Sequence, residues 1–137
     1  MKLNEIMTAR PAVLPGEASI LDAARPMRDN NIGDVLVTRQ EGLCGIVTDR
    51  DIVVRVVAEG MDPAATKLDA ICSHQVTSLS PESTSEEAVR MMREKAVRRI
   101  PVVEQGRPVG IVSIGDLATR LEPKSALAKL SAAAANR

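Results

Sequence analysis

The chain has 137 residues, of which 45% are hydrophobic and 26% are charged, as in an ordinary globular protein. Its eighteen basic and eighteen acidic residues cancel, and it contains no Phe, Tyr or Trp. A neutral chain has no long-range attraction to nucleic acids or anionic membranes, and a chain without aromatic rings lacks the usual stacking platforms. We therefore expect no nucleic-acid partner and no membrane partner.

The first half of the chain predicts two helices that flank a pair of strands. The predicted elements are, in chain order, a helix over 19–31, strands over 34–38 and 43–48 joined by a turn at 41–42, and a helix over 49–60. Ser19 is a hydroxyl N-cap for the first helix, and Pro26 should kink that helix or make its first turn irregular. Gly60 closes the second helix, and residues 61–66 are expected to form a linker.

The second half predicts the same elements in the same order. They are a helix over 84–95, strands over 100–104 and 109–113 joined by a turn at 105–108, and a helix over 114–121. Thr84 and Glu87 form the pattern of a capping box at the start of the first of these helices. The Ala-rich tail is expected to form a short helix that frays into disorder.

The two halves are copies of one unit, related by an offset of 65 residues. Without a gap, the offset pairs Leu14 with Leu79, Ala23 with Ala88, Met27 with Met92, Gly45 with Gly110, Thr48 with Ser113 and Asp51 with Asp116. Each copy reads strand–helix–strand–strand–helix, and its small one-sided sheet cannot bury its apolar face alone. We predict an α/β (α+β) fold of two β-α-β-β-α repeats that pack through their sheets with pseudo-two-fold symmetry. The predicted divisions are 1–65, 66–123 and a tail over 124–137.

The phrases G-I-V-T-D-R-D-I (45–52) and G-I-V-S-I-G-D-L (110–117), in constant register inside this repeat, resemble a tandem pair of CBS domains, a Bateman module. I-M-T before the first copy and V-R-R-I-P-V-V-E in the second match the same family. The first phrase is similar to small stand-alone bacterial CBS-pair proteins of the hypoxic-response type. The resemblance implies a regulatory protein that binds an adenosine-containing ligand between its repeats, in a homodimer that forms a disk of two modules.

The duplicated hydroxyl and carboxylate have a chemistry that suits such a ligand. An ionised carboxylate can accept hydrogen bonds from both ribose hydroxyls, and Asp51 and Asp116 are expected in the first turn of a helix, where the dipole favours the charge. Thr48 and Ser113 can offer a hydroxyl to a phosphate beside the free N–H groups of the same helix. The pattern S/T-x-x-D is also a plain capping box, and the two roles can coexist.

The two copies differ in charge next to this pattern. The second copy has Arg98 and Arg99 where the first has Gly33 and Asp34. In nucleotide-sensing relatives, basic residues at matching positions hold phosphates, whereas a carboxylate repels them. We therefore expect the better nucleotide site on Ser113 and Asp116, although a solvated basic strand edge is an alternative reading of the two arginines.

The resemblance also assigns the segment before each copy's first strand to the other copy's site. The preferred site then takes Thr8, Arg10, Pro11, Arg98, Arg99, Ser113 and Asp116, with Ile111 or Val112 as an apolar wall. The second site takes Asp34, Thr48, Asp51, Cys72, Ser73 and Val76, with Ile46 or Val47 as its wall. His74, the only histidine, is expected in an exposed loop, with a ligand contact as the alternative.

Cys44 and Cys72 have neither CxxC nor metal-ligand spacing, and one histidine with two cysteines cannot form a typical four-ligand zinc site without carboxylates. We expect both cysteines to be reduced and buried as small hydrophobic residues, with no metal site. The N-terminus is too short and polar for a signal peptide, and no apolar run is long enough to span a membrane, so the chain is expected to be cytoplasmic.

The sequence predicts a sensor rather than an enzyme, because it contains no nucleophile–base pair and no glycine-rich phosphate loop. No cofactor is expected to be required. The expected ligand is AMP, ADP or ATP, with NAD and S-adenosylmethionine as alternatives, and its binding would alter an unidentified regulated protein. The competing hypothesis is a ligand-independent dimerisation or docking module, in which the repeated phrases act only as helix caps.

Overall fold

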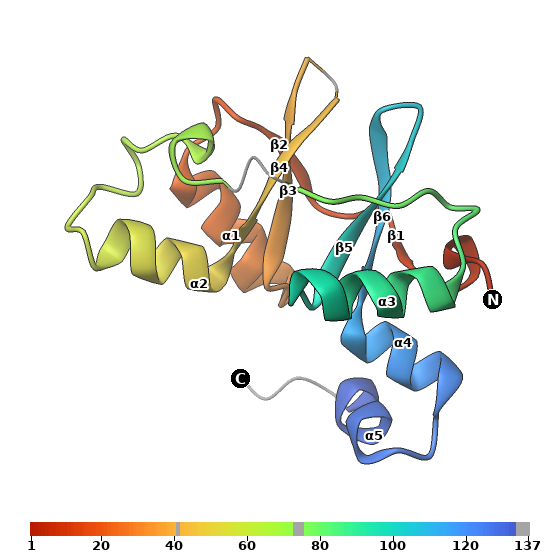
Figure 1. The fold of residues 1–137 in the computed structure, drawn as a ribbon. Helices are drawn as coiled ribbons and strands as arrows, with labels where there is room; N and C mark the ends of the chain where they lie inside the picture. Colours follow the sequence, from red (N-terminus) through yellow and green to blue (C-terminus); the bar gives the residue numbers. More distant parts are fainter. Residues whose placement is uncertain (41, 73–75, 134–137) are drawn as a thin grey trace. The chain divides into compact units, whose positions relative to one another are not determined.

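The computed structural model describes residues 1–40, 42–72 and 76–133 and shows a mixed α+β protein (Figure 1). Its chain divides into two compact units, one formed by Met1–Pro11 with Thr77–Arg137 and the other by Ala12–Val76. The predicted division at residues 65 and 66 follows the sequence repeats, whereas in these units residues 1–11 cluster with the second repeat and residues 66–76 with the first. Each unit contains its own three-stranded sheet.

The Ala12–Val76 unit is built on the sheet β2-β3-β4. Its strands are β2 (Val13–Pro15), β3 (Asp34–Arg39) and β4 (Gly42–Thr48), with β2 parallel and β4 antiparallel to β3. Its helical elements are α1 (Ile20–Asn30), α2 (Asp49–Ile52), the π-helix η2 (Val53–Val57) and the 3-10 turn η3 (Leu68–Ala70). Its core joins the inner face of β3 and β4 to α1, η2 and the segment around η3, through Ile20, Val35, Val47, Val56 and Leu68, all fully buried.

The other unit repeats this plan on the sheet β1-β6-β5. Its strands are β1 (Thr8–Ala9), β5 (Arg99–Glu104) and β6 (Arg107–Ser113), with β6 antiparallel to both neighbours. Its helical elements are the 3-10 turn η1 (Leu3–Glu5), α3 (Ser85–Lys95), α4 (Ile114–Leu121) and α5 (Ala126–Ala132). Its core contains Leu3, Ala88, Ile100, Val112 and Leu117, so the amino-terminal turn is a structural part of this unit.

The predicted strands and helices of both copies are present, and three details differ. Helix α1 continues through Pro26 and begins with a regular turn, because the Ser19 capping box with Asp22 fixes its start. The predicted helix over 49–60 changes from α to π geometry at Val53. The first strand of the second copy is reduced to a single parallel bridge between Leu79 and Val102.

The tail forms the predicted short helix, α5, which packs on α4. Residues 134–137, where fraying was predicted, lie outside the described residues. Within the described ranges, no helix combines the length and the apolar character that crossing a bilayer requires.

Candidate functional site

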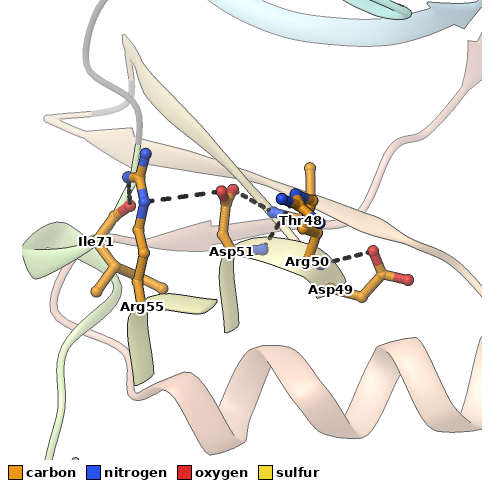
Figure 2. Close-up of polar contacts among 6 residues, drawn as sticks. All are labelled: Thr48, Asp49, Arg50, Asp51, Arg55 and Ile71. Carbon is orange, nitrogen blue, oxygen red and sulfur yellow. Dashed lines mark hydrogen bonds and ion pairs between the residues drawn. The ribbon is translucent and has the colours of Figure 1, made fainter. Parts of the chain in front are cut away.

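The phrase T-D-R-D places a reciprocal capping box at the start of α2 (Figure 2). The Asp51 backbone N–H donates to Thr48 Oγ1 at 3.1 Å, and the Thr48 N–H donates to Asp51 Oδ2 at 2.9 Å. The phrase S-I-G-D builds the same box at the start of α4. Ser113 Oγ accepts from the Asp116 N–H at 3.1 Å, and Asp116 Oδ2 accepts from the Ser113 N–H at 2.9 Å.

The capping interpretation of S/T-x-x-D is therefore confirmed in both copies. Each box satisfies two N–H groups of a helix start with one hydroxyl and one carboxylate oxygen. The second oxygen, Oδ1, takes no part in either box. Asp51 and Asp116 are both half-buried, so neither carboxylate is sealed inside the core.

The outer oxygens of the two carboxylates have different neighbours. Asp51 Oδ1 lies 3.9 Å from Nε of Arg55, whose other end donates to the backbone carbonyl of Ile71 at 2.7 Å (Figure 2). The repeat counterpart of Arg55 is Arg120, which donates to the carbonyl of Glu5 at 2.7 Å. Across the described ranges, no cation lies within 4.0 Å of the Asp116 carboxylate.

Strand register brings most of the predicted site residues to one face of each sheet. Thr48 lies opposite Asp34, and Ser113 lies opposite Arg99. Side chains alternate along a strand, and the neighbouring Val35 and Ile100 belong to the two cores. The predicted residues therefore lie on the sheet faces that turn away from the helices. The apolar residues that were predicted to line the two sites lie on the same faces. Ile46 is half-buried and lies opposite Leu36, and Ile111 is buried and lies opposite Pro101.

The structure separates Arg98 from Arg99. Arg99 faces the same side of the sheet as Ser113, whereas Arg98 precedes the strand, and its carbonyl accepts from the N–H of Ile114 at 2.9 Å. The side chain of Arg98 borders an apolar cavity of about 520 Å³ between α3, α4 and α5, together with Val97, Ile114, Leu117, Leu121 and Leu127. Only Arg99 is thus positioned beside the Ser113–Asp116 box by the sheet.

The amino-terminal segment joins the second copy as the family resemblance implied. Thr8 lies opposite Ile111 in the ladder between β1 and β6, which brings it to the same sheet as Ser113. Arg10 is exposed and has a left-handed backbone, with φ of 54°, and Pro11 is half-buried. On the other unit, Val76 is half-buried, while Ser73 and His74 lie outside the described residues.

The cysteines form a cluster that sequence spacing missed. The ligand atoms of Cys44, Asp69 and Cys72 all lie within 4.8 Å of one another, and neither cysteine is in a disulfide. Cys72 is buried as expected, but Cys44 is only half-buried, because it is the extra residue of a β-bulge in β4. Burial, followed by the neighbouring Cys44 and Asp69, raises the pKa of the Cys72 thiol to about 11.

Comparison with known proteins gives consistent matches over nearly the whole chain. The CBS domain family model matches residues 3–58 and 68–123. The CBS domain-containing protein YhcV of Bacillus subtilis is 36% identical over 116 residues, which are 85% of this chain and 82% of YhcV.

Two solved structures extend these matches to the fold. The crystal structure of hypoxic response protein I with two coordinated zinc ions has a TM-score of 0.77 and 30% identity, covering 88% of this chain and 98% of that one. A hexameric CBS-CP12 protein from bloom-forming cyanobacteria has a TM-score of 0.76 and 28% identity, covering 94% of this chain and 78% of that one.

Proposed function

Because the chain belongs to the CBS-domain family and is a regulatory tandem CBS pair of the hypoxic-response type, we propose that it senses an adenosine-containing ligand. The preferred site is the sheet face that carries Ser113, Asp116, Arg99, Thr8 and Ile111. The ligand class is AMP, ADP or ATP, with NAD and S-adenosylmethionine as the other members of the test panel.

The observation that carries this proposal is the outer oxygen of Asp116. The capping box holds the carboxylate through Oδ2, so a ligand that binds Oδ1 does not have to order the Asp116 side chain first. A fixed, ionised carboxylate is a good acceptor for the two hydroxyls of a ribose, because charge-assisted hydrogen bonds are the stronger kind. Arg99 lies across the ladder from Ser113 and supplies positive charge on the same face, where a phosphate would need it.

The first copy is a weaker candidate for nucleotide binding. The outer oxygen of Asp51 faces Arg55 at 3.9 Å, so a ribose would compete with a cation that is already present. Asp34, which lies opposite Thr48, adds a negative charge at the position where the second copy has Arg99. The Arg55 contact therefore disfavours a ribose at this carboxylate, and the negative charge of Asp34 disfavours a phosphate.

We propose further that the protein works as a homodimer and acts on a separate regulated protein. A solved neighbour of the same fold, the CBS-CP12 protein, is hexameric, which supports self-association. In this chain, Val53, Val57, Ile114 and Leu121 are exposed apolar side chains on the helices, with Val57 60% exposed. Side chains of this kind suit contact with another subunit better than contact with water.

A thermal-shift panel tests the ligand proposal. Millimolar AMP, ADP, ATP, NAD or S-adenosylmethionine at a micromolar site would stabilise the folded protein by about 4 kcal/mol and raise the melting temperature by roughly 10 °C or more. Guanosine and cytidine nucleotides of equal charge are the matched controls. If none of the five compounds raises the melting temperature at millimolar concentration, the sensor proposal fails, and a ligand-independent dimerisation or docking module takes its place.

A further inference from the structure

We propose that Cys44, Cys72 and Asp69 form a binding site for a single divalent metal ion of the zinc class, with both sulfur atoms and Asp69 Oδ1 as ligands. The three residues come from β4, the segment after η3, and η3 itself. This site lies in the Ala12–Val76 unit and does not include Ser113, Asp116 or Arg99. It is therefore independent of the nucleotide proposal.

The spacing of the three ligand atoms is close to that of a tetrahedral site. Zn–S bonds of about 2.3 Å and Zn–O bonds of about 2.1 Å place tetrahedral ligand atoms about 3.6–3.8 Å apart. Cys44 Sγ lies 3.8 Å from Asp69 Oδ1, and all three atoms lie within 4.8 Å of one another. The upper limit of these separations, 4.8 Å, exceeds the tetrahedral spacing by about 1 Å, and small side-chain rotations can close that gap. Three protein ligands leave a fourth position for water.

The surroundings of Asp69 orient it for this role. Its second oxygen, Oδ2, forms an ion pair with Arg39, and Oδ1 lies toward the Cys44 sulfur. Gly16 packs directly beneath the carboxylate, because a Cβ atom at that position would meet Asp69 Cγ and Oδ1 at 3.1 Å. Outer partners of this kind fix the rotamer of a ligating side chain and strengthen metal binding.

The charges in the cluster balance around a divalent ion. Binding displaces one proton from each thiol to solvent and forms two metal–sulfur bonds, so the two thiolates and the Asp69 carboxylate contribute three negative charges. The ion contributes two positive charges and Arg39 contributes one, which gives a neutral cluster. Two thiolates select zinc-class ions over Mg²⁺ and Ca²⁺, because those hard ions require oxygen ligands.

The other repeat shows that the fold does not need these side chains for packing. At the offset of 65 residues, Cys44 corresponds to Val109 and Cys72 to Met7, while Asp69 corresponds to Asn4. Val109 is likewise the extra residue of a bulge, in β6, and both it and Met7 pack on the core of their unit. One copy thus fills the position with an apolar pair, and the other fills it with two thiols and a carboxylate.

Cobalt titration of the reduced, untagged full-length chain, without nucleotide and without oxygen, tests the site. We expect one equivalent of Co²⁺ to produce a thiolate-to-cobalt charge-transfer band and the visible bands of tetrahedral cobalt, both of which Zn²⁺ displaces. C44V/C72M, which copies the pair of the other repeat, should fold normally and show neither band. D69N should retain the charge-transfer band but bind about tenfold or more weakly. The control K67Q, next to η3, should bind like the wild type.

Three results would overturn the metal site. The first is the absence of a charge-transfer band in the wild-type chain. The second is an unchanged metal stoichiometry and spectrum in C44V/C72M. The third is a mass loss of two hydrogens in air together with no metal uptake by the reduced form, which would identify the pair as a disulfide-forming couple instead.

Discussion

A carboxylate that caps a helix has a second oxygen to offer, and the neighbours of that oxygen determine what the residue can do. Asp51 and Asp116 occupy equivalent capping boxes, with N–H donors at 2.9 Å in both. Their outer oxygens differ because Arg55, four residues further along the same helical stretch, approaches Asp51, whereas Arg120 donates to the carbonyl of Glu5. The spacing S/T-x-x-D was enough to predict both boxes. It did not predict that Arg55 approaches the Asp51 carboxylate while its counterpart Arg120 binds a backbone carbonyl instead.

The cluster of Cys44, Asp69 and Cys72 could not be predicted from the sequence. Asp69 is 25 positions from Cys44, and their proximity depends on a bulge that rotates Cys44 out of the regular strand alternation. A bulge in a short β-branched run leaves little trace in a sequence. Spacing alone therefore could not show that the fold brings the Asp69 carboxylate to both thiols.

The raised pKa of the Cys72 thiol predicts how stability depends on alkaline pH in metal-free protein. Because the folded pKa, about 11, lies above the ordinary value of 9.0, this thiol contributes stability below pH 9 that is lost as the pH rises toward 11. The free energy of unfolding should fall by on the order of 2 kcal/mol over that window. Urea denaturation at pH 8, 9, 10 and 11 measures the slope.

Cys72→Ala is the matched variant for this experiment. Its free energy of unfolding should be lower than that of the wild type below pH 9, and the difference should shrink toward pH 11, because the variant lacks the thiol whose titration steepens the alkaline slope. Equal slopes in the two proteins would show that the thiol remains accessible to solvent and titrates normally.

At the scale of elements, periodicity predicted the helices and central strands but not their irregular parts. Ser19 and Thr84 each begin a helix of 11 residues, as their hydroxyl caps indicated. The change to π geometry at Val53 and the two-residue strand β1 were not predicted. Neither is encoded locally, because β1 exists only through its pairing with β6 and a π turn needs no particular residue type.

Strand β1 approaches β6 so closely that Gly110 is required at their contact. A Cβ atom on Gly110 would lie 2.4 Å from Met7 Sδ and 3.0 Å from the backbone oxygen of Thr8. Gly110→Ala should therefore destabilise the protein by about 1–3 kcal/mol and weaken nucleotide binding, because it pushes Thr8 away from the proposed site. Urea denaturation and a nucleotide titration measure the two effects.

The double variant Gly110→Ala/Met7→Ala separates the two contacts. It removes the Met7 side chain and leaves only the approach to the Thr8 oxygen, so nucleotide affinity should recover in part. If Gly110→Ala alone binds nucleotide and unfolds like the wild type, β1 does not hold Thr8 in place.

At the scale of the whole molecule, the repeat fixed the fold class, and the family resemblance placed the amino-terminal residues with the second copy. Thr8 was predicted to lie near Asp116 for its contact with ligand, and the pairing with Ile111 places it on that sheet. Its structural role was not foreseen. Leu3 and Ile6 complete the core of a unit whose other members begin more than 70 residues later, and no local pattern distinguishes them from an exposed terminus.

Leu3→Ala tests this structural role. Leu3 is fully buried, so the substitution should lower the free energy of unfolding by about 2–5 kcal/mol, through lost burial and the cavity that remains. Leu130→Ala, at a side chain that is 75% exposed, is the control and should change it by less than about 0.5 kcal/mol. Equal stability of the two variants would contradict the assignment of residues 1–11 to the second repeat's core.

The central claim is that an adenine nucleotide binds at the Ser113–Asp116 copy, and calorimetric titration of two matched variants with ATP tests it most directly. Asp116→Asn preserves the volume of the side chain and an acceptor oxygen for the cap but removes the charge, and Asp51→Asn makes the same change in the other copy. We predict that D116N weakens ATP binding at least tenfold, while D51N binds within about twofold of the wild type. Equal losses in both variants, or a larger loss in D51N, would contradict the account.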